Sequence, residues 1–152
     1  MVSASATAPV VRVGDRLPDH VVGPITRTTL ALFAGASNDY VPLHIDSDYA
    51  QAAGMDDVFA HGMLSMAYLA QSLTRWAPQE RLRRWSARFT AITPLHATVR
   101  CGGEVVEIFE EGGERLARLK IGAWTDTNLQ TLDGEAVVAL RDNGEAVVSL
   151  GD

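Results

Sequence analysis

The sequence predicts an α+β protein in which a single antiparallel β-sheet packs around one long α-helix. Three observations lead to this prediction. The stretch from Gly62 to Trp76 is largely apolar and has the length of one long helix. The second half of the chain alternates apolar and polar residues in segments separated by turn residues, which is typical of strands. At 152 residues, the chain has the length of one domain with a substantial core.

A first helix is predicted from Thr26 to about Ser37. Threonine is a residue type that caps helix N-termini, and Leu30 and Phe33 recur at helical spacing after it. Pro42 disfavours helical geometry at the residue before it and has no N–H to donate. We therefore expect the helix to end near Ser37 and an irregular loop to follow.

Two further helices are expected. Residues 46–53 have an acidic first turn and are ended by Gly54, so they predict a short helix. The longer helix spans residues 61–76 and is apolar on nearly every side from Met63 to Ala70. This pattern predicts a buried helix rather than an amphipathic one on the surface. At 1.5 Å per residue the helix extends roughly 20 Å, a length that a curved sheet can wrap.

The second half of the chain is predicted to be an antiparallel meander, because its strands are long and its turns are short. Glu111-Gly112-Gly113 and Asp133-Gly134 are interpreted as two of these turns. The predicted strands span residues 85–92, 97–109, 115–125 and 135–141, with a final short strand over residues 145–150.

Composition and charge exclude several classes of protein. The net charge of −6 argues against general nucleic-acid binding, which needs a basic surface. Cys101 is the only cysteine and cannot form an internal disulfide, which is consistent with the cytoplasm. No apolar run approaches the roughly 20 residues that span a bilayer, so no membrane association is expected. Residues 1–9 lack the basic start and apolar centre of a signal peptide, and we expect a disordered tail there.

The loop after the first helix brings a carboxylate and an imidazole together. Asp39 and His44 are five residues apart, a spacing that would place them on opposite faces of a strand or about 140° apart on a helix. On a loop the two side chains can converge, and they would then supply an acid and a base that work near neutral pH. The alternative is that Asp39 caps the following turn and His44 is an ordinary buried histidine.

The segment that contains this pair, Phe33 to His44, resembles the signature of the MaoC-like, (R)-specific enoyl-CoA hydratases, also called hydratase 2. The family pattern is Ser/Thr-Gly-Asp-any-Asn-Pro-Leu/Ile-His, followed later by a His-Gly pair that opens a long helix. The chain differs from it at Asn38, where the family usually has Gly, and at Val41, where it usually has Asn. Valine has no polar group to replace that Asn beside the catalytic pair. The matching positions are Ser37, Asp39, Pro42, Leu43, His44, His61 and Gly62.

The resemblance extends over about residues 10–141 and implies one hotdog domain, which we assign to residues 10–152. It implies reversible addition of water to a trans-2-enoyl thioester of coenzyme A or acyl carrier protein (ACP), which gives a (3R)-3-hydroxyacyl thioester. Asp39 and His44 would be the catalytic residues. A homodimer is expected, a heterodimer is an alternative, and no cofactor is required. No His, Cys, Asp or Glu spacing in the sequence resembles a metal site.

Three residues near the start of the long helix or the loop are candidates for substrate binding. The Gly62 N–H would stabilise the negative charge that develops on the thioester oxygen, because free N–H groups at a helix N-terminus favour anions; the alternative is that glycine only fits a tight start. Ser65 would line the pocket, or hydrogen-bond to the carbonyl four residues earlier. Val41 would shape the pocket. His61 is interpreted as holding the start of the helix by hydrogen bonding.

Basic residues are concentrated between Arg75 and Arg88. Guanidinium groups bind phosphate in a bidentate manner, so this cluster is a candidate docking site for coenzyme A phosphates or an acidic carrier protein. The alternative is a solvated loop with paired charges. The residues assigned to docking are Arg81, Arg83, Arg84 and Arg88.

Two alternative functions remain open from the sequence. One is a dehydratase dedicated to a polyketide or steroid-like acyl group, with Val41 shaping its pocket. The other is a non-catalytic subunit that binds acyl thioesters or completes a heterodimer, which retention of both Asp39 and His44 disfavours. A thioesterase is disfavoured because such enzymes usually carry a carboxylate on the central helix, and no acidic residue lies between Gly62 and Trp76.

Overall fold

The computed structural model describes residues 10–141. One five-stranded sheet forms the centre of the fold, and every neighbouring pair of strands in it is antiparallel. Its strand order is β1-β3-β4-β5-β2. The strands are β1 (His20–Val22), β2 (Leu82–Phe89), β3 (Val99–Glu111), β4 (Glu114–Thr125) and β5 (Gln130–Ala139).

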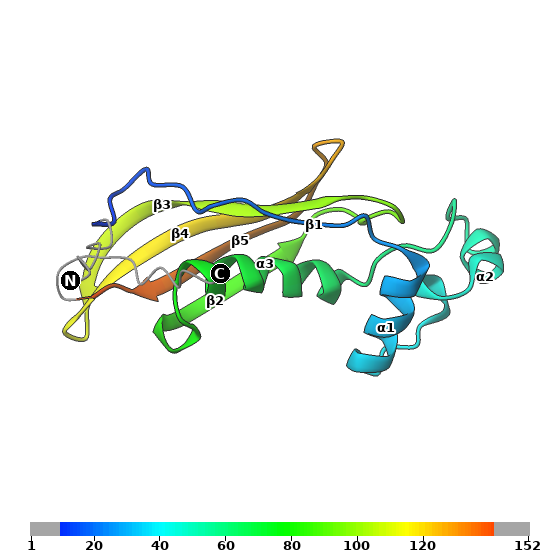
Figure 1. Ribbon diagram of the computed structural model, residues 1–152, viewed down its shortest axis with the longest axis horizontal. Coiled ribbons are helices and arrows are strands. Elements are labelled where there is room, and N and C mark those ends of the chain that lie inside the picture. The colour runs from blue at the N-terminus through cyan, green and yellow to red at the C-terminus, as the bar shows by residue number, and fades with distance from the viewer. Residues whose placement is uncertain (1–9, 142–152) are drawn as a thin grey trace, which may run out of the picture.

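The helix α3 (Gly62–Trp76) lies along one face of this sheet (Figure 1). Leu69 and Leu73 of α3 are buried in the main core together with Leu119 of β4 and Val99 of β3. The helix is not buried on every side, contrary to the sequence prediction. Met63 is 55% exposed, because the sheet covers only one face of α3 within this chain. No helix among the described residues has the length and apolar character needed to cross a membrane.

The helices α1 (Arg27–Ser37) and α2 (Ser47–Ala52) lie beyond the end of the sheet at which α3 begins (Figure 1). Thr26 caps α1 as predicted. Its hydroxyl accepts a hydrogen bond from the Thr29 N–H, and the Thr26 N–H donates to the Thr29 hydroxyl. These two bonds form a reciprocal capping box. Both helices occupy the positions predicted from the sequence, and they place the loop between them at the N-terminus of α3.

Two parts of the strand prediction are wrong. Asp133-Gly134 is not a turn but lies inside β5, and the chain reverses earlier, between β4 and β5. A Cβ on Gly134 would lie 2.3 Å from the Ser86 backbone oxygen, so this glycine permits β2 and β5 to approach closely. The strand predicted over residues 85–92 is shifted to Leu82–Phe89 because Leu82 already pairs with Val138 of β5.

The meander is also shorter than predicted. Only β3, β4 and β5 are consecutive neighbours, whereas β2 pairs with β5 at the far edge of the sheet. The turn at Gly112-Gly113 is confirmed, with φ of 62° and 78°, values that favour glycine. The tail predicted over residues 1–9 and the strand predicted over residues 145–150 lie outside the described residues.

Candidate active site

The loop that follows α1 carries Asp39. Asn38 ends α1 in the left-handed conformation, with φ of 57°, and so turns the chain away from the helix axis. The backbone N–H of Val41 then donates to the Asp39 carboxylate, with Val41 N 3.3 Å from Asp39 Oδ1. Residue 41 therefore contacts Asp39 through its backbone, while the Val41 side chain is 45% exposed.

The short helix η1 (Pro42–His44) presents His44 to the segment that precedes α3. His44 Nδ1 lies 2.8 Å from the Phe59 backbone oxygen, and the two rings meet edge to face with centroids 4.9 Å apart. A carbonyl oxygen only accepts hydrogen bonds, so Nδ1 carries the proton. The Nε2 lone pair of the neutral ring is therefore free to accept a proton.

His61, the residue before α3, supports this pair from the protein interior. Its side chain is buried, and its Nε2 donates to the Asp39 backbone oxygen over 3.1 Å. Burial lowers the pKa of His61, and the neighbouring His44 lowers it further, because both disfavour a positive charge there. His61 is therefore the neutral partner of the group, in agreement with the hydrogen-bonding role expected for it.

Asp39, His44 and His61 each place one polar atom within 4.8 Å of the others. A separation of this size between a carboxylate and an imidazole is bridged by a single oxygen atom that hydrogen-bonds to both. The group is a poor metal site, because the rings of His44 and His61 are stacked with centroids 4.0 Å apart. Imidazole lone pairs lie in the ring plane, so stacked rings do not direct them at one shared ion.

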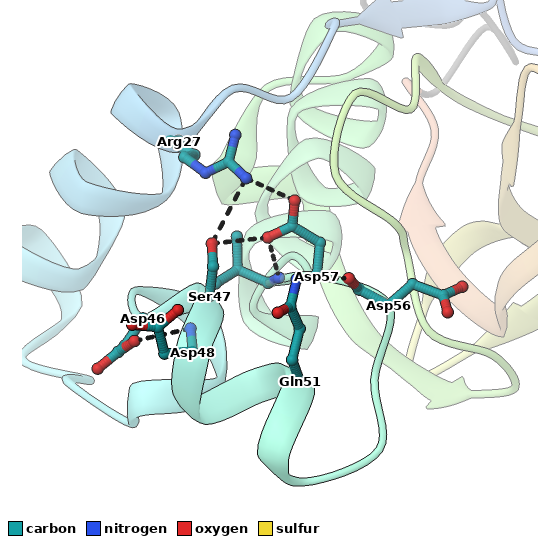
Figure 2. Close-up of polar contacts among 8 residues, drawn as sticks. Arg27, Asp46, Ser47, Asp48, Gln51, Asp56 and Asp57 are labelled. Carbon is teal, nitrogen blue, oxygen red and sulfur yellow. Dashed lines mark hydrogen bonds and ion pairs between the residues drawn. The ribbon is translucent and has the colours of Figure 1, made fainter.

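A polar network outside the site fixes the segments that carry it (Figure 2). Arg27 of α1 pairs with Asp57, and Ser47 of α2 donates to the same carboxylate over 2.8 Å. The Val58 N–H donates to it as well. The Ser47 hydroxyl and the Val58 N–H are the main causes that hold the pKa of Asp57 below its usual value, and Arg27 adds to them. The network ties α1 and α2 to the segment that leads into Phe59.

A cavity of about 330 Å³ lies beside the start of α3. Gly62 and Ser65 are in its wall, as the sequence prediction of their position requires. The Ser65 hydroxyl lies 3.1 Å from the Thr93 hydroxyl, and within residues 10–141 it makes no hydrogen bond to the preceding turn of its own helix. The remaining lining is mixed, with apolar residues and threonines: Phe59, Ala60, Phe89, Thr90, Ala91, Ile92, Thr93, Thr131 and Leu132.

Gly62 has a steric reason to be glycine. A Cβ at this position would lie 2.9 Å from the Phe89 ring, which is closer than normal packing permits. As the first residue of α3, Gly62 has an N–H that cannot pair within the helix. Gly62 lines the cavity and stands at the end of α3 where the helix dipole is positive.

The four arginines assigned to docking are all engaged in contacts within the described chain, and they lie on β2 or just before it rather than on a loop. These contacts match the alternative of paired charges, and a docking role stays a prediction. The partners are the Leu140 backbone oxygen for Arg81, Glu114 for Arg83, Glu111 for Arg84 and Asp133 for Arg88.

Sequence reasoning did not identify Phe59, Thr93 or Phe89 as parts of the site. Phe59 orients His44 through its backbone oxygen, which no side-chain pattern reveals. Phe89 reaches the cavity from the strand β2, and Thr93 reaches it from the loop after β2. Both residues are far in sequence from the motif that contains Asp39 and His44. A Thr-Pro pair before a strand is too common to indicate a pocket residue.

The fold and this site define a hotdog domain with a carboxylate–imidazole pair at the start of its central helix. The sequence model of the family described as "MaoC like domain" matches residues 10–122. The chain belongs to the MaoC-like domain family, whose members include dehydratases and (R)-hydratases.

Among curated proteins, the chain is 41% identical over 49 residues to an (R)-specific enoyl-CoA hydratase of Rhodospirillum rubrum, which is 32% of this chain and 34% of that protein. It is 31% identical over 77 residues to the mouse peroxisomal multifunctional enzyme type 2, which is 51% of this chain and 10% of that protein. The matched region thus spans about a third and about a tenth of the length of these relatives.

Solved structures agree on the fold. The (R)-hydratase PhaJ1 of Pseudomonas aeruginosa aligns with a TM-score of 0.73 and 27% identity, over 85% of this chain and 82% of that chain. The ChsH1–ChsH2 complex of Mycobacterium tuberculosis aligns with a TM-score of 0.73 and 22% identity, over 86% of this chain and 98% of that chain. The second likeness shows the fold alone.

Proposed function

We propose that the protein is an (R)-specific enoyl-thioester hydratase, which runs in reverse as a (3R)-3-hydroxyacyl-thioester dehydratase. The observation that carries this proposal is that a carboxylate oxygen of Asp39 and a ring nitrogen of His44 lie within 4.8 Å of each other, while His44 Nε2 has no hydrogen-bond partner within residues 10–141. Two groups so placed hold one water molecule between them. The similarity to an (R)-specific enoyl-CoA hydratase supports the same reaction.

In hydration, the water oxygen bonds to C3 of the substrate while the dyad takes up one water proton. C2 receives a proton, so the dyad ends the cycle in its starting protonation state. His44 suits proton uptake because its Nδ1 proton is engaged by Phe59 and its Nε2 is an acceptor. Asp39 orients the water and shares the proton transfer.

The Gly62 N–H stabilises the thioester oxygen as it gains negative charge. This assignment is supported by its position at the N-terminus of α3 and at the wall of the cavity. The apolar part of the cavity receives the acyl chain. The coenzyme A or ACP portion would then extend outward past the exposed side chains of Val41, Met63 and Phe89.

The same exposed apolar side chains favour a second copy of the chain as partner. Phe89 lies on β2, which is the edge strand of the sheet and has a free side among the described residues. An edge with free N–H and C=O groups pairs readily with another strand. We propose a homodimer in the cytoplasm, and a heterodimer is the alternative, as the ChsH1–ChsH2 complex illustrates.

A dehydratase dedicated to a bulky acyl group is the second candidate function. It is suggested by the sequence alone, because Val41 stands where the family usually has a polar residue; the Val41 side chain is 45% exposed and is not among the residues that line the cavity. Such an enzyme would act slowly on crotonyl-CoA and faster on a polyketide or steroid-like thioester.

Product stereochemistry tests the proposal. The protein is incubated with crotonyl-CoA and with longer enoyl-CoAs, and each hydrated product is resolved into its (R) and (S) forms. We expect the (3R)-hydroxyacyl product alone. An (S) product would overturn the proposal, and activity confined to ring-containing acyl thioesters would establish the second candidate.

A further inference from the structure

A pair of buried hydroxyl groups lies in the wall of the cavity, and neither group has a role in the proton transfers proposed for Asp39 and His44. Ser65 of α3 and Thr93, in the loop between β2 and β3, are 1% and 5% exposed. Their hydroxyl oxygens are 3.1 Å apart. Both residues line the cavity that also exposes Gly62.

The proton count of this pair leaves one hydrogen without an acceptor. Two hydroxyls carry two hydrogens, and the bond between their oxygens uses one of them. Within residues 10–141 neither hydroxyl has a second hydrogen-bond partner. A buried donor without an acceptor is costly, and both side chains line a cavity in which a ligand could supply that acceptor.

The position of Ser65 relative to Gly62 determines what this hydrogen can reach. Residues three apart lie on the same side of a helix, with roughly 5–6 Å between their β-carbon positions. One oxygen atom placed between them can accept from the Gly62 N–H and from the Ser65 hydroxyl at about 3 Å each. A thioester oxygen at that point would have two donors instead of one.

Thr93 is held firmly enough to orient its neighbour. Its backbone oxygen accepts from the Ala60 N–H over 2.9 Å, and the next residue, Pro94, forms a β-bridge with Phe59. The Phe59 backbone oxygen also holds His44. The Thr93 hydroxyl is therefore fixed to the same segment that fixes the base of the dyad.

We propose that Thr93 donates its hydroxyl proton to Ser65 Oγ and thereby directs the Ser65 proton into the cavity, where it binds the thioester oxygen together with the Gly62 N–H. Ser65 contacts the substrate, and Thr93 is a positioning residue. Hydrogen bonds in such a chain strengthen one another as charge develops on the final acceptor. The inference rests on the proposed thioester chemistry of this site.

The test uses Asp39→Asn protein, in which turnover is blocked, and a conjugated 2,4-dienoyl-CoA as ligand. Polarisation of the thioester carbonyl shifts the absorption band of such a ligand to longer wavelength, so the shift on binding reports the donors directly. We expect a red shift in the Asp39→Asn protein that falls by at least half on adding either Ser65→Ala or Thr93→Val. Thr93→Ser, which keeps the hydroxyl, should restore it, and Ser72→Ala, on the same helix outside the cavity lining, should not affect it.

Steady-state rates in the protein with an intact dyad give a second measurement. Ser65→Ala should lower kcat about 100-fold, the scale of losing one oxyanion donor, and Thr93→Val about tenfold, each with little change in KM. An unchanged band and rate in Thr93→Val would overturn the inference while leaving the hydratase proposal intact. A dienoyl-CoA that does not bind at all would overturn both.

If Thr93→Val reduced the red shift or kcat and Thr93→Ser reduced it equally, the inference would also be overturned, because packing rather than the hydroxyl would then be responsible. Circular dichroism of each variant checks the fold. Valine has nearly the shape of threonine, so the cavity wall should be preserved in Thr93→Val.

Discussion

The imidazole rings of His44 and His61 are stacked, with centroids 4.0 Å apart and planes inclined by 28°. The two rings have different hydrogen-bond partners. His44 donates to the Phe59 backbone oxygen and His61 to the Asp39 backbone oxygen. Because two positive charges at this distance would repel, one ring must stay neutral when the other accepts a proton. The lowered pKa of His61 identifies it as the neutral ring.

This relationship predicts a pH dependence of stability. The pKa of His61 is lower in the folded protein than its ordinary value of about 6.5. The unfolded chain therefore takes up the proton first as the pH falls, and the stability due to neutral His61 is present above about pH 6.5 and lost below it. His61→Phe keeps a ring in the stack but does not titrate. Urea unfolding at pH 7.5 and pH 5.5 should show a smaller loss of stability in this variant than in the original protein.

The exposed His96 provides the matched control for that experiment. It has φ of 68°, a conformation that asparagine tolerates, so His96→Asn removes a histidine without strain. We expect it to leave the pH dependence unchanged. Equal losses of stability in the original protein and in His61→Phe would contradict the assignment.

Gly62→Ala tests the role of the α3 N-terminus. The added methyl would lie 2.9 Å from the Phe89 ring, which is half-exposed and able to move, so the fold should survive. The methyl would still crowd the space in front of the Gly62 N–H. We expect a loss of at least tenfold in kcat/KM with a change in unfolding free energy below about 1 kcal/mol.

Gly35→Ala is its control. Gly35 lies inside α1, and an added Cβ there meets no atom within 4 Å. Alanine in a helix is more favourable than glycine by about 0.5–1 kcal/mol, so this variant should gain stability and keep its activity. A Gly62→Ala protein with full activity would argue that this glycine only accommodates Phe89.

Substitutions at Val41 test whether this residue supports Asp39 through its backbone N–H rather than through its side chain. Val41→Ala and Val41→Asn keep the N–H that donates to Asp39 Oδ1, and we expect kcat within about threefold of the original. Val41→Pro removes this donor at a φ of −57°, which proline adopts, and should lower kcat about tenfold. A large gain in activity in Val41→Asn would instead show that the missing polar side chain limits this protein.

Cys101 should be unreactive in the folded protein. It is fully buried in the core, and burial raises the pKa of its thiol to about 12, so almost no thiolate exists at neutral pH. Alkylation by iodoacetamide at pH 8, followed by mass spectrometry, should be negligible in buffer and complete in denaturant. Fast alkylation in buffer would show that the sheet opens around Cys101.

The parts of the fold that were predicted correctly depend on local signals. Thr26 caps α1 by chemistry that acts within a few residues, and α1 ends near Ser37 as expected, although the residue that ends it is Asn38 rather than Pro42. The start of α3 at Gly62 agrees with the His-Gly pair of the family pattern. Asp133-Gly134 has the same local signal as a turn, yet it lies in β5. Here the close approach of Ser86 from β2 requires the glycine. The residues around Gly134 in the sequence do not indicate which strand pairs with it.

The residues of the candidate site also differ in how far local sequence predicts their positions. Asp39 and His44 lie on one loop, and the spacing together with Pro42 allowed their proximity without requiring it. Asp39 also accepts from the Val41 N–H, as the alternative of a turn-capping carboxylate predicted. Phe59 and Thr93 enter the site through a backbone oxygen and through a loop far along the chain. Such contacts depend on how the sheet places its connections, which no residue pattern encodes.

The decay of the enoyl-thioester absorbance on addition of protein to crotonyl-CoA, and to longer enoyl-CoAs, tests the central claim most directly. The original protein is measured beside Asp39→Asn and His44→Ala. We predict hydration by the original protein and a loss of at least about 100-fold in each variant, the scale of removing an acid or base, with folding intact by circular dichroism. Full activity in either variant, or no activity of the original protein with any chain length or carrier, would contradict the account.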